Sequence, residues 1–171
     1  MAEPLARFDF HFDPPIEGLS FAVDRFADGI SDFSGLFGTL SGRFQAGMRK
    51  QFASQGGWGA GGWADLSPAY DAWKREHYPG RPIGVLRGYL RNAMTGGSGY
   101  MERIGKDAAE FGMADSSKAV QYGRHFAERR PVVALPREEV RAWQEDTHRW
   151  LHDEAKAAGW GMGSWPARGL R

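Results

Sequence analysis

Apolar residues recur at spacings of three and four over residues 16–55. The recurring positions are Leu19, Val23, Phe26, Ile30, Phe33, Phe37, Leu40, Phe44, Met48 and Phe52. With ~3.6 residues per turn, they form a stripe along one face of a helix. The pattern predicts one long helix, and its glycines predict a bend near Ser34–Gly35 or a break within Gly38–Gly42. The stripe packs on the domain's own sheet or is partly buried by a neighbouring subunit.

Strands are predicted in three other segments. Residues 5–13 place Phe8, Phe10 and Phe12 on one side and polar residues on the other, as in a half-buried strand. The same segment is equally suited to an extended arm that pairs with a neighbouring subunit. Residues 100–113 predict a strand or hairpin, and the β-branched run 130–135 predicts a short strand.

Shorter helices are marked by their capping residues. Ser67 is a good N-cap and Pro68 suits the first helical position, so a helix is expected to run to about His77. Further helices are predicted over 85–94, from a Ser116 or Ser117 cap to about Phe126, and over 138–158.

Together these elements predict an α+β fold. A small mixed or antiparallel sheet is packed by a long N-terminal helix and a C-terminal helix. We expect a single domain over 1–158, with an N-terminal strand or arm at 1–15 and a Gly/Trp loop at 56–63. Residues 159–171, rich in Gly and Trp, form a tail that becomes ordered only against a partner.

Composition narrows the function classes. The 171 residues carry 22 basic and 21 acidic side chains, a formal net charge of +1, whereas wholesale nucleic-acid binding favours a larger basic excess. The absence of cysteine excludes disulfides, thiol nucleophiles and cysteine-ligated zinc. No segment resembles a signal peptide or approaches the ~20 apolar residues of a membrane span. We therefore expect a cytoplasmic chain without a membrane partner.

Catalytic or metal-binding patterns are weak. His148 and His152 have a spacing that zinc sites use, but no third ligand is evident, and a solvated helix face explains them better. Asp9, His11 and Asp13 alternate on one strand face, as the charges of a protected sheet edge do. We expect no enzyme, and we assign no catalytic, cofactor-binding or metal-binding residue.

Arginine and tryptophan side chains are the candidates for contacts between subunits or with DNA in a lumen. Arginine supplies the positive charge that phosphates need, and tryptophan is enriched at interfaces. Solvated helix faces, salt bridges and ordinary core packing are the simpler explanations. The candidates are Arg81, Arg87, Arg91, Arg130, Trp58, Trp63, Trp160 and Trp165.

Several short motifs occur in the same order as in one known protein family. Trp63 precedes Leu66-Ser67-Pro68, and Gly84-Val85-Leu86-Arg87-Gly88 and a Thr95-Gly96 stop follow. Gln121-Tyr122-Gly123 and Arg130-Pro131-Val132-Val133-Ala134-Leu135 come next, before an acidic helix start. Over about residues 58–150 this series resembles the tail-completion, or virion-morphogenesis, proteins of tailed bacteriophages. Val132 and Ala134 replace the Phe and Gly that are usual in the family's Arg-Pro segment.

The resemblance implies a structural role without catalysis or cofactor. Such proteins are tail terminators or neck proteins in the virion, where they cap the tail tube and join it to the head connector. The implied assembly is a homo-oligomeric ring, expected to be hexameric, through which DNA passes without sequence-specific binding. Assembly takes place in the host cytoplasm. The alternative hypothesis is a nucleic-acid-binding module that uses the Arg-bearing short helices.

Overall fold

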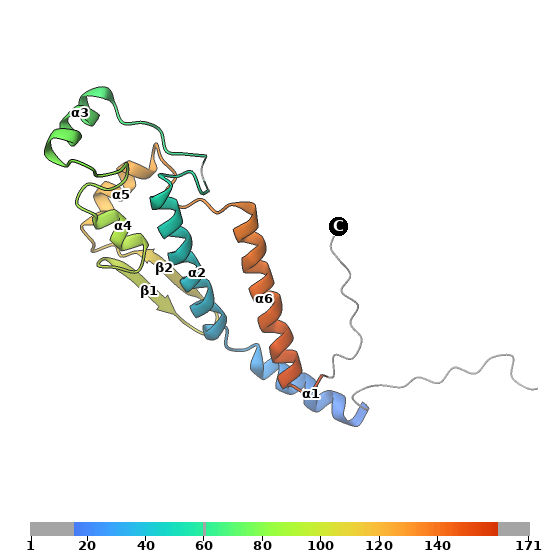
Figure 1. Cartoon of the computed structure of the whole chain (residues 1–171). Helices are drawn as coiled ribbons and strands as arrows, with labels where there is room; N and C mark the ends of the chain where they lie inside the picture. Colours follow the sequence, from blue (N-terminus) through green and yellow to red (C-terminus); the bar gives the residue numbers. More distant parts are fainter. Residues whose placement is uncertain (1–15, 60, 161–171) are drawn as a thin grey trace, which may run out of the picture. The chain divides into compact units, whose positions relative to one another are not determined.

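The computed structural model describes residues 16–59 and 61–160, which form helices and one small antiparallel sheet (Figure 1). The predicted α+β class is confirmed. The elements in chain order are α1 (Ile16–Gly29), α2 (Ser34–Ala53), α3 (Pro68–His77), α4 (Tyr89–Met94), β1 (Tyr100–Ile104), β2 (Ala109–Met113), α5 (Ala119–Ala127) and α6 (Arg137–Ala157). The predicted arm, 1–15, and Trp165 in the predicted tail lie outside the described residues.

The described residues fall into two compact units. The larger unit, 33–147, holds α2 to α5, the sheet and the first part of α6. The smaller unit combines 16–32 with 148–160, and so contains α1 and the last part of α6. The domain predicted from the sequence, 1–158, spans both units.

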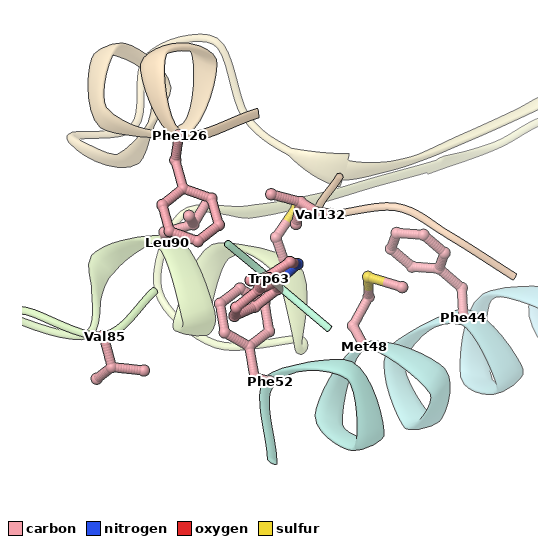
Figure 2. Packing of buried hydrophobic residues seen from close by; sticks show 9 residues of the cluster. Phe44, Met48, Phe52, Trp63, Val85, Leu90, Phe126 and Val132 are labelled. Carbon is pink, nitrogen blue, oxygen red and sulfur yellow. The ribbon is translucent and has the colours of Figure 1, made fainter. Parts of the chain in front are cut away.

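The core of the larger unit gathers around α2. Buried side chains of α2 meet residues from the segments on both sides of α3, from α4 and from α5, as Figure 2 shows. The cluster consists of Phe44, Met48, Phe52, Trp63, Val85, Leu90, Met94, Phe126 and Val132. Burial of such side chains contributes about 1.5–3 kcal/mol each, so this cluster is the main source of stability in the unit.

The sheet is a single hairpin. Tyr100 lies opposite Met113 and Ile104 opposite Ala109, which confirms the predicted hairpin over 100–113. Helix α2 packs on it: the Phe44 and Phe111 rings are 5.2 Å apart, and the Ser41 and Tyr100 hydroxyl oxygens are 2.9 Å apart. Within 16–59 and 61–160, no third strand pairs with either edge.

The prediction of one helix over 16–55 is wrong in its continuity. The chain leaves the helix after Gly29 and re-enters at Ser34. In the break, the Phe33 N–H donates to the Lys106 carbonyl at 2.7 Å, and the Ser31 hydroxyl donates to the Asp28 carbonyl at 2.6 Å. These bonds compete with the helical pattern. The break lies beside the predicted bend at Ser34–Gly35, whereas Gly38–Gly42 is helical.

The prediction of a strand over 130–135 is also wrong. Pro131 has no N–H to give to a sheet, and its carbonyl accepts side-chain hydrogen bonds instead of strand bonds. Residues 130–136 therefore form an irregular segment before α6.

Three helix starts refine the sequence reading. The Ser67 cap of α3 is confirmed, because its hydroxyl accepts a bond from the Tyr70 N–H at 3.4 Å. Helix α4 begins at Tyr89 rather than Val85, because the chain turns at 83–84 and bends at 86–88, with positive φ at Gly84 and Gly88. The predicted serine cap of α5 is wrong: Lys118 precedes the helix without a side-chain cap bond, and the buried Ser117 hydroxyl has no hydrogen-bond partner among the described residues.

In the smaller unit, α1 packs on the last part of α6. The Phe26 and Trp160 rings are 5.2 Å apart, and the Arg25 guanidinium donates to the Ala157 carbonyl at 2.7 Å. Ala22 is buried, but Val23, in the predicted stripe, is 45% exposed. Only part of the stripe is therefore covered.

Candidate functional site

The Gly/Trp loop and the Arg-Pro segment, two of the sequence motifs, meet in the fold. We call this place the Trp63 junction; it is formed by Gln51, Trp63 to Asp65, Arg130 and Pro131. The Trp63 indole N–H donates to the Pro131 carbonyl at 2.8 Å, and the Gln51 side-chain amide donates to the same carbonyl at 3.3 Å. The Gln51 side-chain oxygen accepts from the Gly59 N–H at 3.0 Å. Buried polar groups need such partners, and here those partners hold the Gly/Trp loop against the Arg-Pro segment.

Arg130 makes the second connection in the junction. Its guanidinium donates to the Ala64 carbonyl at 2.7 Å and to the Asp65 carbonyl at 2.8 Å, and it lies 5.4 Å from the centre of the Phe126 ring. Bonds from a charged donor are stronger than neutral ones. Arg130, predicted as a subunit or lumen contact, is thus engaged in holding the segment that leads into α3.

A third motif reaches the junction through Gly84. Its φ is +78°, and a Cβ built on it would lie 2.7 Å from the Trp63 ring and 3.2 Å from the Phe126 ring. The Trp63 and Phe126 rings meet edge to face, with centroids 5.0 Å apart. Only glycine suits this backbone conformation and this space, so Gly84 allows the turn before α4 to approach the core.

Helix α3 displays an exposed aromatic ladder, defined here as Tyr70, Trp73, His77 and Tyr78. Trp73 stacks on Tyr70 at 5.4 Å and on His77 at 5.0 Å between ring centroids. Trp73 is 40% exposed and Tyr70 is 36% exposed. Among the described residues, no other helix or strand packs closely along α3, which Figure 1 shows joined to its unit by irregular segments. The ladder is therefore open to a partner.

Beside α3 lies a cleft of about 700 Å³, here called the α3 cleft. The residues that line it include Gln55, Asp65, Asp71, Lys74, Arg75 and Arg81. Asp71 and Arg75 form an ion pair at 2.7 Å. The volume lies within the ~300–1,000 Å³ that is common for small-ligand sites.

Lys74 is the unusual residue of the α3 cleft, since only 4% of it is exposed. Its ammonium donates to the Pro82 carbonyl at 2.6 Å. Burial lowers the pKa of Lys74, the Asp71 carboxylate partly offsets this, and the charge of Arg130 adds to the lowering. The sequence marks Lys74 only as one of several basic residues around the two short helices, because its burial depends on the turn at 78–83, which carries Pro82.

A second cleft, of about 470 Å³, lies on the other side of the Ala64–Ser67 segment. Tyr70, Tyr122, His125 and Arg129 line it. Burial raises the pKa of Tyr122, Tyr70 raises it further, and Arg130 opposes the rise. The neutral phenol is thus the stable form, and it supplies a hydrogen-bond donor but no charge.

The other predicted arginines are spread over the surface. Arg81, Arg87 and Arg91 are all exposed. The neighbouring Tyr78 side chain and, to a smaller extent, Tyr89 favour the charged form of Arg87 and raise its pKa. Arg81 lines the α3 cleft, whereas Arg91 lies on α4. The structure thus separates residues that the sequence grouped together.

The predicted tryptophans occupy different environments. Trp63 is 6% exposed and belongs to the core, so its ring is not displayed to a partner. Trp58 is half-buried, lies against Gly47, and has the Lys50 ammonium 5.7 Å from its ring centre. Trp160 packs on Phe26. The exposed Trp73, which the sequence did not single out, is recognisable only from its place on α3.

In the described part of the chain, His148 and His152 have no further side chains near them that would complete a metal site. His148 and His152 are exposed on α6, and His152 faces Asp153 at 3.5 Å. Within the described parts of the chain, no three His, Cys, Asp or Glu side chains come close enough to hold a metal. Asp9, His11 and Asp13 lie outside the described residues.

No protein-family model, no characterised protein and no solved structure matches this chain. None of the helices in the described ranges is long and apolar enough to cross a bilayer.

Proposed function

We propose that this chain is a structural virion protein at the head–tail junction of a tailed phage. In this role it is a tail terminator, or tail completion protein, that caps the tail tube and joins it to the head connector. The role requires a stable subunit with surfaces for its neighbours and no reaction chemistry.

The observation that supports the proposal is the convergence of the motifs behind the family resemblance. Trp63, Gly84 and the adjacent pair Arg130 and Pro131 come from three separate parts of the sequence and contact one another or share one core. A chance series of degenerate motifs has no reason to form one contact network. Motifs that specify a common core are instead expected to meet, because each fills space left by the others.

Two surfaces are suited to subunit contacts in a ring. The first is the hairpin, whose outer half carries the exposed residues Glu102, Arg103 and Ile104 and whose edges no described strand pairs. The second is the aromatic ladder of α3, which offers rigid apolar area of the kind found at interface centres. In a cyclic ring, two different surfaces of each subunit meet around the axis, and Arg81, Arg87 and Arg91 are available to a lumen that carries DNA.

The first test is the oligomeric state of the full chain. Native mass spectrometry and class averages from negative-stain electron microscopy are expected to show a closed ring of about six copies. Trp73→Ala, which leaves the core intact, is expected to shift the ring toward smaller species. A wild-type chain that stays monomeric at all accessible concentrations contradicts the proposal.

The second test addresses the capping activity. When the tail-tube protein of the same phage polymerises in vitro, addition of this chain is expected to shorten the tubes and to place density at one tube end in micrographs. An equal amount of an unrelated ring protein is the control. Unchanged tube lengths together with bare tube ends contradict a terminator role.

A nucleic-acid-binding module is the second candidate, favoured by the exposure of Arg81, Arg87 and Arg91 together with the ring of Trp73. Aromatic rings stack on bases and arginines contact phosphates. A steep fall of DNA affinity with salt, lost in Arg87→Gln and Trp73→Ala, supports this candidate. Absence of binding at ~50 mM salt excludes it.

A further inference from the structure

The α3 cleft combines a buried ammonium with an excess of positive charge. Lys74 lies inside it, with Arg75 and Arg81 at its surface, and the carboxylates are Asp65 and Asp71. Asp71 is already paired with Arg75, and Asp65 is exposed to water. The charge of Lys74 therefore has no dedicated counter-ion within hydrogen-bonding distance among the described residues.

The Lys74 ammonium also has hydrogen-bond donors that no described residue uses. An ammonium has three donors, and among the described residues the Lys74 ammonium has one recorded acceptor, the Pro82 carbonyl. A charge withdrawn from water without a counter-ion is costly unless something pairs with it. Arg130 on the other side of the Asp65 segment increases that cost, because it brings a second positive charge near Lys74.

Other donors face the same space. The Gln55 side-chain oxygen accepts from the Ile83 N–H at 2.9 Å, and the Gln55 amide N–H₂ has no acceptor among the described residues. Arg81, on the turn that carries Pro82, has no side-chain partner among them either. These donors suit an acceptor that carries negative charge.

We propose that the α3 cleft is a binding site for an oxyanion group, a carboxylate or a phosphate, held by Lys74 with help from Arg81 and Gln55. Such a group pairs with the Lys74 ammonium and uses its free donors, and the cleft has room for a small molecule that carries it. The site does not depend on ring formation. A failed test of the proposed virion role therefore does not contradict this site, and a failed test of the site does not contradict the virion role.

Lysine side-chain NMR of the full chain tests the site directly. The chain has five lysines, Lys50, Lys74, Lys106, Lys118 and Lys156, so ¹³Cε-labelled lysine yields few signals. Separate titrations use inorganic phosphate, succinate, and sodium chloride at equal ionic strength. The Lys74 signal is expected to shift saturably with phosphate, succinate or both, with a dissociation constant on the order of millimolar. The exposed Lys106 serves as the internal control.

Variants separate the cleft from general charge effects. Lys74→Met is expected to abolish saturable binding measured by calorimetry, whereas Lys106→Met leaves it unchanged. If Lys74→Met fails to fold, Arg81→Gln decides, because Arg81 is exposed; it is expected to weaken binding about threefold.

The arms of the titration identify the ligand class. Saturation by phosphate alone points to a phosphate-bearing ligand, and saturation by succinate alone to a carboxylate. Equal, non-saturating shifts of Lys74 and Lys106 in all three salts, or no shift of Lys74, overturn the proposal. So does binding that Arg81→Gln and Lys106→Met weaken equally.

Discussion

The core around Trp63 and the surface of α3 use aromatic side chains in opposite ways. Trp63 is 6% exposed, donates its indole N–H to the Pro131 carbonyl, and meets Phe52 and Phe126 edge to face. Trp73 is 40% exposed; among the described residues it stacks on Tyr70 and His77 of its own helix and meets Tyr78, just after the helix, at a tilted angle. The first tryptophan thus connects distant segments of the core, whereas the second contacts only neighbouring residues in the described ranges and keeps part of its ring exposed.

Charged groups show the same contrast. Arg130 is satisfied by two carbonyls and an aromatic ring within the subunit. Lys74, a short distance away on α3, has one carbonyl and no close counter-ion in the described ranges. The polar groups of the core are thus paired within the chain, whereas the Lys74 ammonium in the α3 cleft keeps donors without an acceptor among the described residues. We therefore expect substitutions in the core to change stability and substitutions at α3 to leave it nearly unchanged.

The strongest test of this contrast is the pair Trp63→Ala and Trp73→Ala. Removal of the Trp63 ring leaves a cavity and takes away one of the two hydrogen bonds to the Pro131 carbonyl, so unfolding is expected to become easier by ~3–5 kcal/mol. Removal of the exposed Trp73 ring is expected to change the free energy of unfolding by no more than ~0.5 kcal/mol. Urea denaturation measures both, and similar losses in the two variants would remove the distinction.

The second test compares two glycines in the same backbone conformation. Gly84 and Gly80 have φ of +78° and +73°, but only at Gly84 would a Cβ strike neighbouring rings. Gly84→Ala is therefore expected to destabilise the protein by ~1–3 kcal/mol more than Gly80→Ala, because overpacking adds to the backbone strain that both share. Equal losses of stability in the two variants, measured by thermal or urea denaturation, would mean that the turn at Gly84 is not packed tightly against Trp63.

The third test compares two neighbouring arginines. Arg130→Gln loses the charged bonds to Ala64 and Asp65 and is expected to lower the free energy of unfolding by about 1.5–3 kcal/mol. Arg129→Gln is the matched control, since Arg129 is exposed, and should stay within ~0.5 kcal/mol of the wild type. Faster hydrogen exchange over 64–67 in Arg130→Gln alone would sharpen the assignment, and an unchanged exchange rate there would contradict it.

The smallest expected effect is the pH dependence that Lys74 confers. Because its pKa in the folded protein is lowered from 10.5 mainly by burial, the unfolded chain holds this proton more tightly. Charged Lys74 therefore costs stability at neutral pH, and the cost is relieved as the pH rises through the folded pKa toward 10.5. Relative to Lys74→Met, the wild type is expected to gain stability over that range.

Denaturation at a series of pH values gives this difference. Lys106→Met provides the baseline, because Lys106 is exposed and its removal should yield a difference from the wild type that is flat with pH. A flat difference for Lys74→Met as well would show that Lys74 is solvated in the folded chain.

The sequence alone determined the local elements. Ser67 and Pro68 specified the start of α3, residues 100–113 indicated a strand or hairpin, and the apolar spacing indicated the inner face of α2, because these signals act over a few neighbouring residues. It also determined the α+β class, which follows from the order of such elements. It misplaced Arg130–Leu135 as a strand, since a β-branched run has the same composition whether or not a partner strand exists.

Only the tertiary structure decided which side chains are buried in the core and which remain exposed at the surface. The roles of Trp63 and Arg130 depend on the Pro131 carbonyl and the Ala64–Asp65 segment, which lie more than sixty residues away in the chain. The burial of Lys74 depends on the turn that carries Pro82. The sequence gives the chemistry of each side chain, but long-range packing decides which partners that side chain meets. For this reason, only the folded chain shows that Lys74 is buried with a single acceptor among the described residues.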